Sequence, residues 1–545
     1  MFSLSVGVFM NTIENPIIPG FNPDPSIVRV GDDYYIATST FEWFPGVQIH
    51  QSRDLVHWKL CTHALVDQQH LNMLGMDNSE GVYAPALSYS DGQFWLCFSN
   101  VHSCRGGSWM ATPCFVVSAP SISGPWSLPV SIGNYGFDPS LFHDDDGKKY
   151  MLNMLWDGRQ GKNKFGGIVL QEFDVSTGKL CGPVKTIFTG TKLGCTEGPQ
   201  ILKKDNFYYL VTAEGGTSLD HAVTVCRSHS IWGPYELHPQ NPILSSRFQE
   251  DAPLQRAGHG FFVKTQGGQW YMTHLCSRQI RDPEQGLYGP KYGNGRSILG
   301  RESAIQAIEW RDDWPWLKGG GTVPFEQVKG PDLPTHIWPA RPNRDDFDQP
   351  QLDINFASLR EAVNPSWLSL TERPGYLRLK GRQYLYSRYQ QSLIARRWQS
   401  FNASAQTAIE FKPTHFMQMA GLVVYYSRKD HYFLKQTLSD EGETALQICQ
   451  FIGGKYDEHE LVLLPSCERI HLKVDLKQQW YQFSYSLDSN YWVAIGPRLN
   501  STALSDEAGN DVFRFTGSFV GLFACDLTGQ NLHADFDYFE YLQEP

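Results

Sequence analysis

The stretch Asp24-Pro25-Ser26-Ile27-Val28 decides the fold, because its pattern returns four more times along the chain. A small or polar residue leads into an apolar stretch, a tight turn follows, and a second strand carries bulky side chains. In the first copy the turn is Gly31-Asp32 and the return strand is Tyr34-Tyr35-Ile36. Glycine and aspartate reach positive φ at little cost, so such turns are typical of β-hairpins.

The other four copies begin at positions 84, 138, 197 and 259, which gives separations of 60, 54, 59 and 62 residues. Each interval has room for about four short strands, the content of one propeller blade. We therefore predict five blades, each led by one residue on its innermost strand. The copies open with Ala84-Pro85-Ala86-Leu87, Asp138-Pro139-Ser140-Leu141-Phe142, Glu197-Gly198-Pro199-Gln200-Ile201 and His259-Gly260-Phe261-Phe262-Val263.

The repeat ends after Arg301, where a Pro-rich stretch from Pro331 to Pro342 predicts a linker or a strap. From Asp345 onward, apolar and polar residues alternate without the earlier repeat, which is typical of a β-sandwich. We predict an all-β chain with a five-bladed β-propeller over 12–325, a linker over 326–344 and a β-sandwich over 345–545.

Composition narrows the class of ligand. The 46 basic and 57 acidic residues give a net charge of −11, which opposes binding to nucleic acid or to an anionic membrane surface. The apolar stretch Met1–Met10 has no basic residue before it and no clear cleavage site, so we expect no secretory signal. No later apolar run is long enough to cross a bilayer. A neutral ligand is favoured.

The eleven cysteines are odd in number and never spaced as Cys-x-x-Cys. They predict reduced, mostly buried thiols in a cytoplasmic protein rather than disulfides or a metal site. The sequence is compatible with a monomer and with a homo-oligomer.

The leading residues suggest chemistry. Innermost strands of a propeller line its central channel, so Asp24, Asp138, Glu197 and His259 should converge there. A single aspartate opening a strand is more often a turn residue, but three acids at one repeat position favour a shared site. Pro23 and Pro25 predict stiff, extended backbone at Asp24.

Glycoside hydrolysis needs such acids. One carboxylic acid protonates the leaving oxygen, and one carboxylate activates water or attacks the sugar. The acid must keep its proton near the working pH, which burial or a nearby negative charge promotes. Asp138 is a candidate for that charge beside Glu197, but spacing alone does not separate acid from base.

Several motifs resemble glycoside hydrolase family forty-three, and most closely its two-domain β-xylosidases. The resemblance covers nearly the whole chain and implies a five-bladed propeller, a concanavalin-like sandwich and an inverting mechanism at non-reducing ends. It rests on Asn22-Pro23-Asp24-Pro25-Ser26, Thr40-Phe41-Glu42-Trp43-Phe44-Pro45-Gly46, Gly136-Phe137-Asp138, Thr196-Glu197-Gly198-Pro199, Ala213-Glu214-Gly215-Gly216, Leu299-Gly300-Arg301-Glu302-Ser303 and Ala534-Asp535-Phe536-Asp537-Tyr538-Phe539.

The resemblance also implies roles. Asp24 corresponds to the general base, Glu197 to the general acid, and Asp138 to the residue that orients the acid and tunes its pKa. Phe41 and Tyr83 correspond to the walls of the sugar pocket, although relatives often carry Trp where this chain has Tyr83.

Further residues follow by the same resemblance. Arg301 corresponds to an arginine that hydrogen-bonds substrate. His259 corresponds to a histidine that in some members touches a divalent cation through water, so we expect no required cofactor but leave open a calcium ion near His259; the alternative is a hydrogen-bonded channel residue. From the sandwich, Phe513 or Phe515 is expected to reach the pocket, unless both belong to the core.

The predicted activity is an exo-acting β-1,4-xylosidase that releases D-xylose from small xylooligosaccharides, with α-L-arabinofuranosidase activity as a second capacity. An arabinofuranosidase or arabinanase on the same fold is one alternative. A retaining fructosidase is another, but it would carry an Asn-Asp-Pro-Asn-like motif where this chain reads Asn22-Pro23-Asp24-Pro25. A non-catalytic carbohydrate-binding protein is the alternative of another class, and the complete set of three acids disfavours it.

Overall fold

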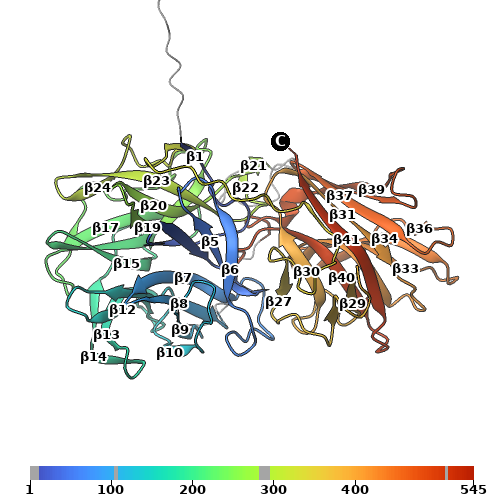
Figure 1. Cartoon of the computed structure of the whole chain (residues 1–545), viewed down its shortest axis with the longest axis horizontal. Coiled ribbons are helices and arrows are strands. Elements are labelled where there is room, and N and C mark those ends of the chain that lie inside the picture. Colours follow the sequence, from blue (N-terminus) through green and yellow to red (C-terminus); the bar gives the residue numbers. More distant parts are fainter. Residues whose placement is uncertain (1–10, 104–107, 282–294, 510–512, 545) are drawn as a thin grey trace, which may run out of the picture.

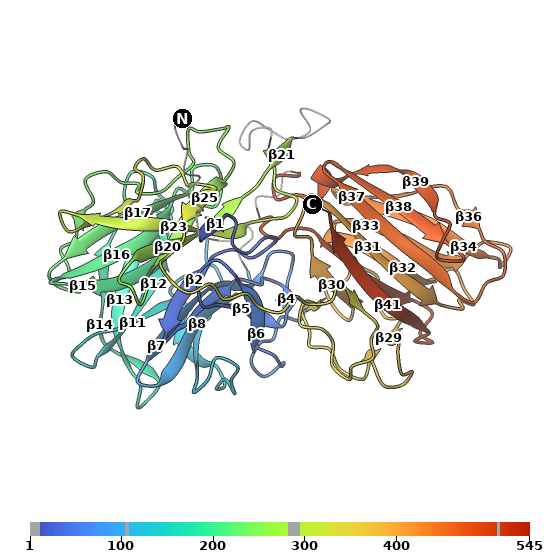
Figure 2. The same cartoon turned by 45° about the horizontal axis from the view of Figure 1, so that its top comes forward.

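The computed structural model describes residues 11–103, 108–281, 295–509 and 513–544, so the apolar stretch Met1–Met10 lies outside the described residues. The first part of the chain builds a propeller and the second part a sandwich beside it (Figure 1 and Figure 2). Among the described residues, the only helix is the 3-10 turn η2 (Ser501–Leu504), and no helix is long and apolar enough to cross a membrane.

Five antiparallel sheets of four strands form the blades. In each blade the first strand lies innermost, because β2 contacts β7 and β19, β11 contacts β7 and β15, and β15 contacts β19, which closes a ring. The strands are β2 (Ser26–Val30), β3 (Asp33–Thr38), β5 (Gly46–Ser52) and β6 (Lys59–Leu65) in blade 1; β7 (Gly81–Ser90), β8 (Gln93–Val101), β9 (Cys114–Ala119) and β10 (Val130–Gly133) in blade 2; β11 (Ser140–His143), β12 (Lys149–Trp156), β13 (Phe165–Asp174) and β14 (Lys179–Phe188) in blade 3; β15 (Glu197–Lys204), β16 (Phe207–Glu214), β17 (Ala222–Ser228) and β18 (Glu236–Leu237) in blade 4; and β19 (Gln255–Lys264), β20 (Trp270–Ser277), β23 (Glu302–Arg311) and β24 (Trp314–Leu317) in blade 5.

Two short pairs lie outside the blades. Strand β1 (Thr12–Glu14) pairs with β25 (Gln327–Lys329), and β21 (Ile280–Arg281) pairs with β22 (Gly295–Arg296). Because β25 falls in the segment 326–344, the segment predicted as a linker is hydrogen-bonded to the start of the propeller and acts as a strap.

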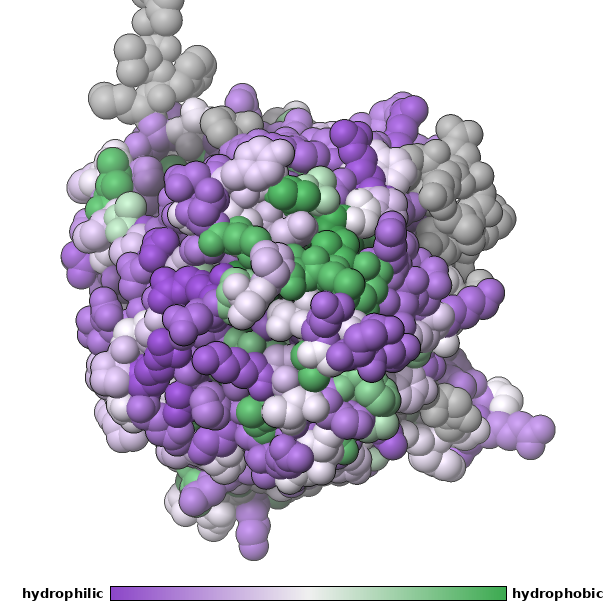
Figure 3. All heavy atoms as spheres, turned by 90° about the vertical axis from the view of Figure 1, so that its right-hand side faces the viewer, coloured by the Kyte–Doolittle hydropathy of each residue, from purple (hydrophilic) through white to green (hydrophobic). Residues whose placement is uncertain are grey.

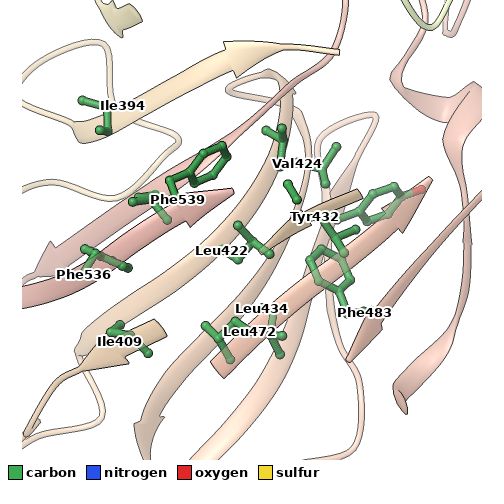
Figure 4. Close-up of a cluster of buried hydrophobic side chains, with 14 of the residues drawn as sticks. Ile394, Ile409, Leu422, Val424, Tyr432, Leu434, Leu472, Phe483, Phe536 and Phe539 are labelled. Carbon is green, nitrogen blue, oxygen red and sulfur yellow. The ribbon is translucent and has the colours of Figure 1, made fainter. Parts of the chain in front are cut away.

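The second domain is a sandwich of two antiparallel sheets. Apolar side chains from both sheets meet between them, among them Leu422, Leu434, Leu472 and Phe483 (Figure 4). One sheet has the order β28 (Leu368–Ser369), β29 (Leu377–Lys380), β41 (His533–Gln543), β31 (Asn402–Glu410), β37 (Ile470–Lys477), β38 (Trp480–Ser486) and β39 (Val493–Asn500), with β26 (Arg344–Asp345) on β41; the other has β35 (Lys455–Glu458), β34 (Thr444–Ile452), β33 (Asp430–Leu438), β32 (Gln418–Ser427), β40 (Phe519–Asp526), β30 (Ser392–Arg397), β27 (Ala357–Leu359) and β4 (Trp43–Phe44), with β36 (Val462–Leu463) on β34. The predicted fold class, a five-bladed propeller followed by a sandwich, is confirmed.

Strand β4 ties the two domains together. It comes from the connection between β3 and β5 of blade 1, yet it pairs with β27 at the edge of a sandwich sheet. Trp43 on this strand is fully buried and stacks on Phe519 of β40, with ring centroids 3.8 Å apart. A buried tryptophan contributes a large apolar area, so this contact fixes the sandwich against the propeller.

The face of the molecule on the sandwich side is mostly hydrophilic but carries apolar areas, the largest of them near its centre (Figure 3). Large apolar side chains are exposed on this domain, for example Leu463 and Tyr491. Apolar areas rimmed by polar residues are typical of contact surfaces.

Candidate active site

Four of the five leading residues carry chemistry, and the structure gathers them at the propeller axis. Asp24 precedes β2, Asp138 precedes β11, Glu197 begins β15, and His259 lies in β19. Each is buried, with 5 to 7% of its surface exposed. All four line one cavity of about 260 Å³.

A left-handed kink recurs where the innermost strands begin. The residues Asp24, Ala84, Asp138 and His259 have φ values of 57°, 38°, 58° and 59°. In blade 4 the kink falls one residue later, at Gly198 with φ 55°. A Cβ at Gly198 would lie 2.9 Å from the ring of His259, so only glycine fits there.

The prediction of an extended backbone at Asp24 is therefore wrong. Proline disfavours an α conformation in the residue before it, which led to that expectation, but Asp24 and Asp138 both precede proline and both have positive φ. Positive φ is costly for a residue with a Cβ and persists only where surrounding contacts impose it. Hydrogen bonds to the two carboxylates supply such contacts.

Asp24 is held on three sides. Ser39 donates a hydrogen bond to its Oδ2 at 2.6 Å, and Nη1 of Arg301 lies 3.2 Å from Oδ1. Nδ1 of His259 is 3.7 Å from the same oxygen. Arg301 is buried and also lies 5.5 Å from the ring centroids of Phe41 and Phe515. The orientation of Asp24 is thus fixed by charged and neutral donors.

Asp138 and Glu197 are coupled. The backbone N–H of Gly198 donates to Oδ2 of Asp138 at 2.9 Å, which places Asp138 beside the residue that follows Glu197. Burial, and then the charge of Asp24, raise the pKa of Asp138. Burial raises the pKa of Glu197 well above its usual range, and the charges of Asp138 and Asp24 raise it further.

The Glu197 carboxyl group is ready to donate a proton. Among the described residues none forms a hydrogen bond with its side chain, and that side chain lines the cavity. A carboxyl group with a raised pKa holds its proton at neutral pH and can give it to an oxygen of a bound molecule. Asp24, held by Arg301 and Ser39 on another blade, is the second carboxylate that such a molecule would meet.

Aromatic rings wall the cavity. Phe41 and Tyr83 lie 4.6 Å apart between ring centroids, and the Tyr83 hydroxyl donates to the carbonyl of Ser79. All the predicted site residues, including Phe513 and the alternative Phe515, line this one cavity. The lining consists of Asp24, Phe41, Tyr83, Ala84, Met110, Phe137, Asp138, Trp156, Phe165, Glu197, Gly216, Thr217, His259, Arg301, Phe513 and Phe515.

The sequence prediction missed the wall that blade 3 supplies. Phe137 lies next to Asp138 in the motif Gly136-Phe137-Asp138, so its position beside a predicted catalytic residue could have identified it. Trp156 and Phe165 come from the end of β12 and the start of β13 and pack 5.6 Å apart. Nothing in their local sequence distinguishes them from core aromatics.

The sandwich closes the cavity through the segment that leads into β40. The backbone N–H of Phe515 donates to Ser79, and Arg301 donates to the Phe515 carbonyl. Farther back, Nη1 of Arg256 on β19 is 3.0 Å from Asp506 and 3.2 Å from Glu507. These three side chains are buried, and a broken buried ion pair costs roughly 3–5 kcal/mol. The domain interface therefore holds the cavity wall in place.

A calcium ion near His259 would need water for most of its ligands. Calcium takes about 6–8 oxygen ligands, and of the two charged groups that act on His259, Asp24 offers carboxylate oxygens whereas Arg301 is a cation. In the part of the chain that the structure describes, no group of three or more His, Cys, Asp and Glu residues could hold a metal ion.

Comparisons with known proteins agree along the whole chain. A sequence model described as Glycosyl hydrolases family 43 matches residues 13–315, and one described as Beta xylosidase C-terminal Concanavalin A-like domain matches residues 344–542. The chain is 65% identical over 533 residues to a xylan 1,3-beta-xylosidase of Vibrio sp, covering 98% of this chain and 99% of that one.

Two other relatives extend this result. A xylosidase/arabinosidase of Humicola insolens is 44% identical, with 98% of each chain covered. The crystal structure of a xylan beta-1,4-xylosidase from Bacillus halodurans C-125 superimposes with a TM-score of 0.94 at 47% identity, covering 98% of this chain and 100% of that one.

The coupling between the acids predicts a measurable pKa change. In the variant Asp138→Asn a negative charge that raises the pKa of Glu197 is gone, so the pKa of Glu197 should fall toward its usual range. This pKa is measured by carbon-13 NMR titration of labelled glutamate carboxyl groups, with the Glu197 signal assigned through Glu197→Gln.

The matched control is Asp205→Asn, at an exposed turn of blade 4, which should leave the Glu197 titration unchanged. An unaltered Glu197 titration in Asp138→Asn would contradict the coupling.

Proposed function

The chain belongs to glycosyl hydrolases family 43, and from this premise we propose that it is an exo-acting, inverting xylosidase that removes terminal D-xylose from xylooligosaccharides. One observation carries the proposal. Three buried carboxylates from blades 1, 3 and 4 face one cavity, and its volume of about 260 Å³ suits one sugar unit rather than a polymer.

The division of labour follows from the surroundings of each acid. Glu197, whose pKa is raised by burial and by its acidic neighbours, protonates the glycosidic oxygen as the bond from that oxygen to C1 breaks. A water molecule attacks C1 from the opposite face and gives its proton to Asp24. The product carries the inverted anomeric configuration, and exchange with solvent returns both acids to their starting states.

The remaining residues bind and orient. Asp138 accepts the hydrogen bond from Gly198, and its charge adds to the effect of burial, which is the larger cause of the raised pKa of Glu197. Phe41, Tyr83 and Phe513 present apolar faces to the C–H bonds of the sugar. Arg301, which already contacts Asp24, has further N–H groups for substrate hydroxyls.

We further propose that the protein is cytoplasmic and forms a homo-oligomer. The described part of the chain gives nine cysteines as free thiols, namely Cys61, Cys97, Cys114, Cys181, Cys226, Cys276, Cys449, Cys467 and Cys525. They support the predicted cytoplasmic location, because thiols persist in reducing compartments. The apolar areas on the sandwich side of the molecule support a homo-oligomer.

Removal of either reacting acid tests the mechanism. Asp24→Ala and Glu197→Ala should each lower kcat by about 10²–10⁴-fold on xylobiose, because each deletes one proton transfer. An aryl xyloside with a very acidic leaving group needs no protonation, so it should partly rescue Glu197→Ala and not Asp24→Ala. Equal rescue of both variants would refute the division of roles, and anomeric proton NMR showing retention would refute the inverting mechanism.

The linkage and the sugar are settled by a second assay. We predict cleavage of β-1,4-xylobiose; the Vibrio relative makes β-1,3-xylobiose the competing substrate, and the Humicola relative makes an arabinofuranoside the third. The acids act on the bond next to the bound ring, so the linkage determines how the rest of the substrate is placed. The preferred linkage should therefore be seen by comparing KM and kcat for the two xylobioses. We also propose that no cofactor is required, so a chelator should leave the rates unchanged. A preference for the arabinofuranoside over both xylobioses would contradict the proposed function.

A further inference from the structure

A second cavity lies between the propeller and the sandwich, away from the acids. Its volume is about 810 Å³. Blade 1, the segment 17–22 before β2, the strap and the end of β30 all contribute to it. We call it the interdomain basic cavity, and His50, Lys59, Trp338, Arg341, Arg396 and Arg397 are among the residues that line it.

The charge of this cavity is one-sided. Its lining includes Lys59, Arg341, Arg396 and Arg397, and none of the residues found to line it is acidic. Arg341 is paired with Asp353, 3.2 Å away, and Lys59 lies 3.7 Å from the ring centroid of Trp338. The chain as a whole has a net charge of −11, so the positive charge of this cavity is opposite in sign to that of the whole protein.

Arg397 is a buried positive charge in the interdomain basic cavity. Only 6% of its surface is exposed, Nε donates to the carbonyl of Phe21 at 2.7 Å, and the rings of Phe21 and Phe519 flank the guanidinium. No carboxylate of the described residues lies within 4 Å of it. Burial lowers its pKa to about 9, with no acid to oppose the effect. A buried charge without a partner is costly, and buried charges are normally paired.

A neighbouring histidine also has a donor to spare. His50 on β5 is 7% exposed and lines the cavity. Its Nδ1 is buried and has no hydrogen-bond partner among the described residues. Burial, and then the charge of Arg397, lower the pKa of His50 to about 3, so its ring is neutral and has one N–H to donate.

We propose that the interdomain basic cavity binds one small oxyanion, a phosphate, sulfate or carboxylate group, between Arg397 and His50. Guanidinium groups present N–H pairs that match the oxygens of such anions. A bound oxyanion would neutralise Arg397 and would connect β5 of blade 1 with β30 of the sandwich. This site is separate from the cavity of the acids, so the inference does not depend on the proposed activity.

Phosphate binding to the whole chain tests the proposal. Equilibrium dialysis with labelled inorganic phosphate, at constant ionic strength set with chloride, should give one phosphate per chain. The thermal midpoint should rise with phosphate concentration, because a ligand that binds only the folded state stabilises it. Sulfate and glucuronate in competition show which source of oxyanion binds most tightly.

Variants locate the site. Arg397→Gln should weaken phosphate binding by at least about 10-fold, because hydrogen bonds between charged groups are worth that much or more. If Arg397→Gln fails to fold, His50→Phe, which removes the other donor of the proposed site, should still weaken binding. Lys148→Gln, which removes an exposed charge on blade 3, and Glu197→Gln should bind phosphate as the unmodified chain does.

Two results would overturn the inference. One is that the unmodified chain takes up none of phosphate, sulfate and glucuronate, in which case the carbonyl of Phe21 and the two rings suffice for Arg397. The other is that a folded Arg397→Gln variant, or His50→Phe where Arg397→Gln does not fold, binds phosphate as tightly as the unmodified chain. Because Glu197→Gln retains the cavity, loss of activity and loss of anion binding are distinguishable.

Discussion

The active site depends on three carboxylates being buried together beside one guanidinium. Asp24, Asp138 and Glu197 share Arg301, and no described residue adds a second cation in direct contact with them. Like charges in a dry site cannot all be ionised at neutral pH, so a proton is held among them. Burial and mutual repulsion thus supply an acid beside a carboxylate, which is the arrangement that glycoside hydrolysis requires.

The propeller creates this burial, and the sandwich completes it. Each blade has a left-handed kink at its leading residue or at the next one, and the leading residues, far apart in the chain, meet at one axis. The open side is closed by Phe513 and Phe515, which are held through Ser79, Arg301 and the buried contacts of Arg256. Two domains are therefore needed for one binding site, and the stack of Trp43 on Phe519 keeps them in register.

Much of this organisation could be predicted from the repeat. Hairpin turns and regular spacing are local signals, and equivalent positions in equivalent blades must meet at the axis, so the three acids and His259 were found without coordinates. The left-handed backbone at Asp24 could not be predicted in this way. The conformational preference of a residue before proline can be judged from the local sequence, whereas the tertiary contacts that override this preference cannot. The sequence did not predict strand β4 or the cavity-lining pair Trp156 and Phe165 for a similar reason. An edge strand that joins another domain and a ring that faces a cavity both resemble ordinary core sequence.

A crystal structure of the Glu197→Gln variant soaked with xylobiose would show whether the acids flank one glycosidic bond. We predict one terminal xylosyl ring in the cavity, with the glycosidic oxygen within hydrogen-bond distance of residue 197 and a water molecule between C1 and Asp24 on the opposite face. A sugar that binds outside the cavity, or that meets Asp24 and residue 197 on the same face of the ring, would contradict it.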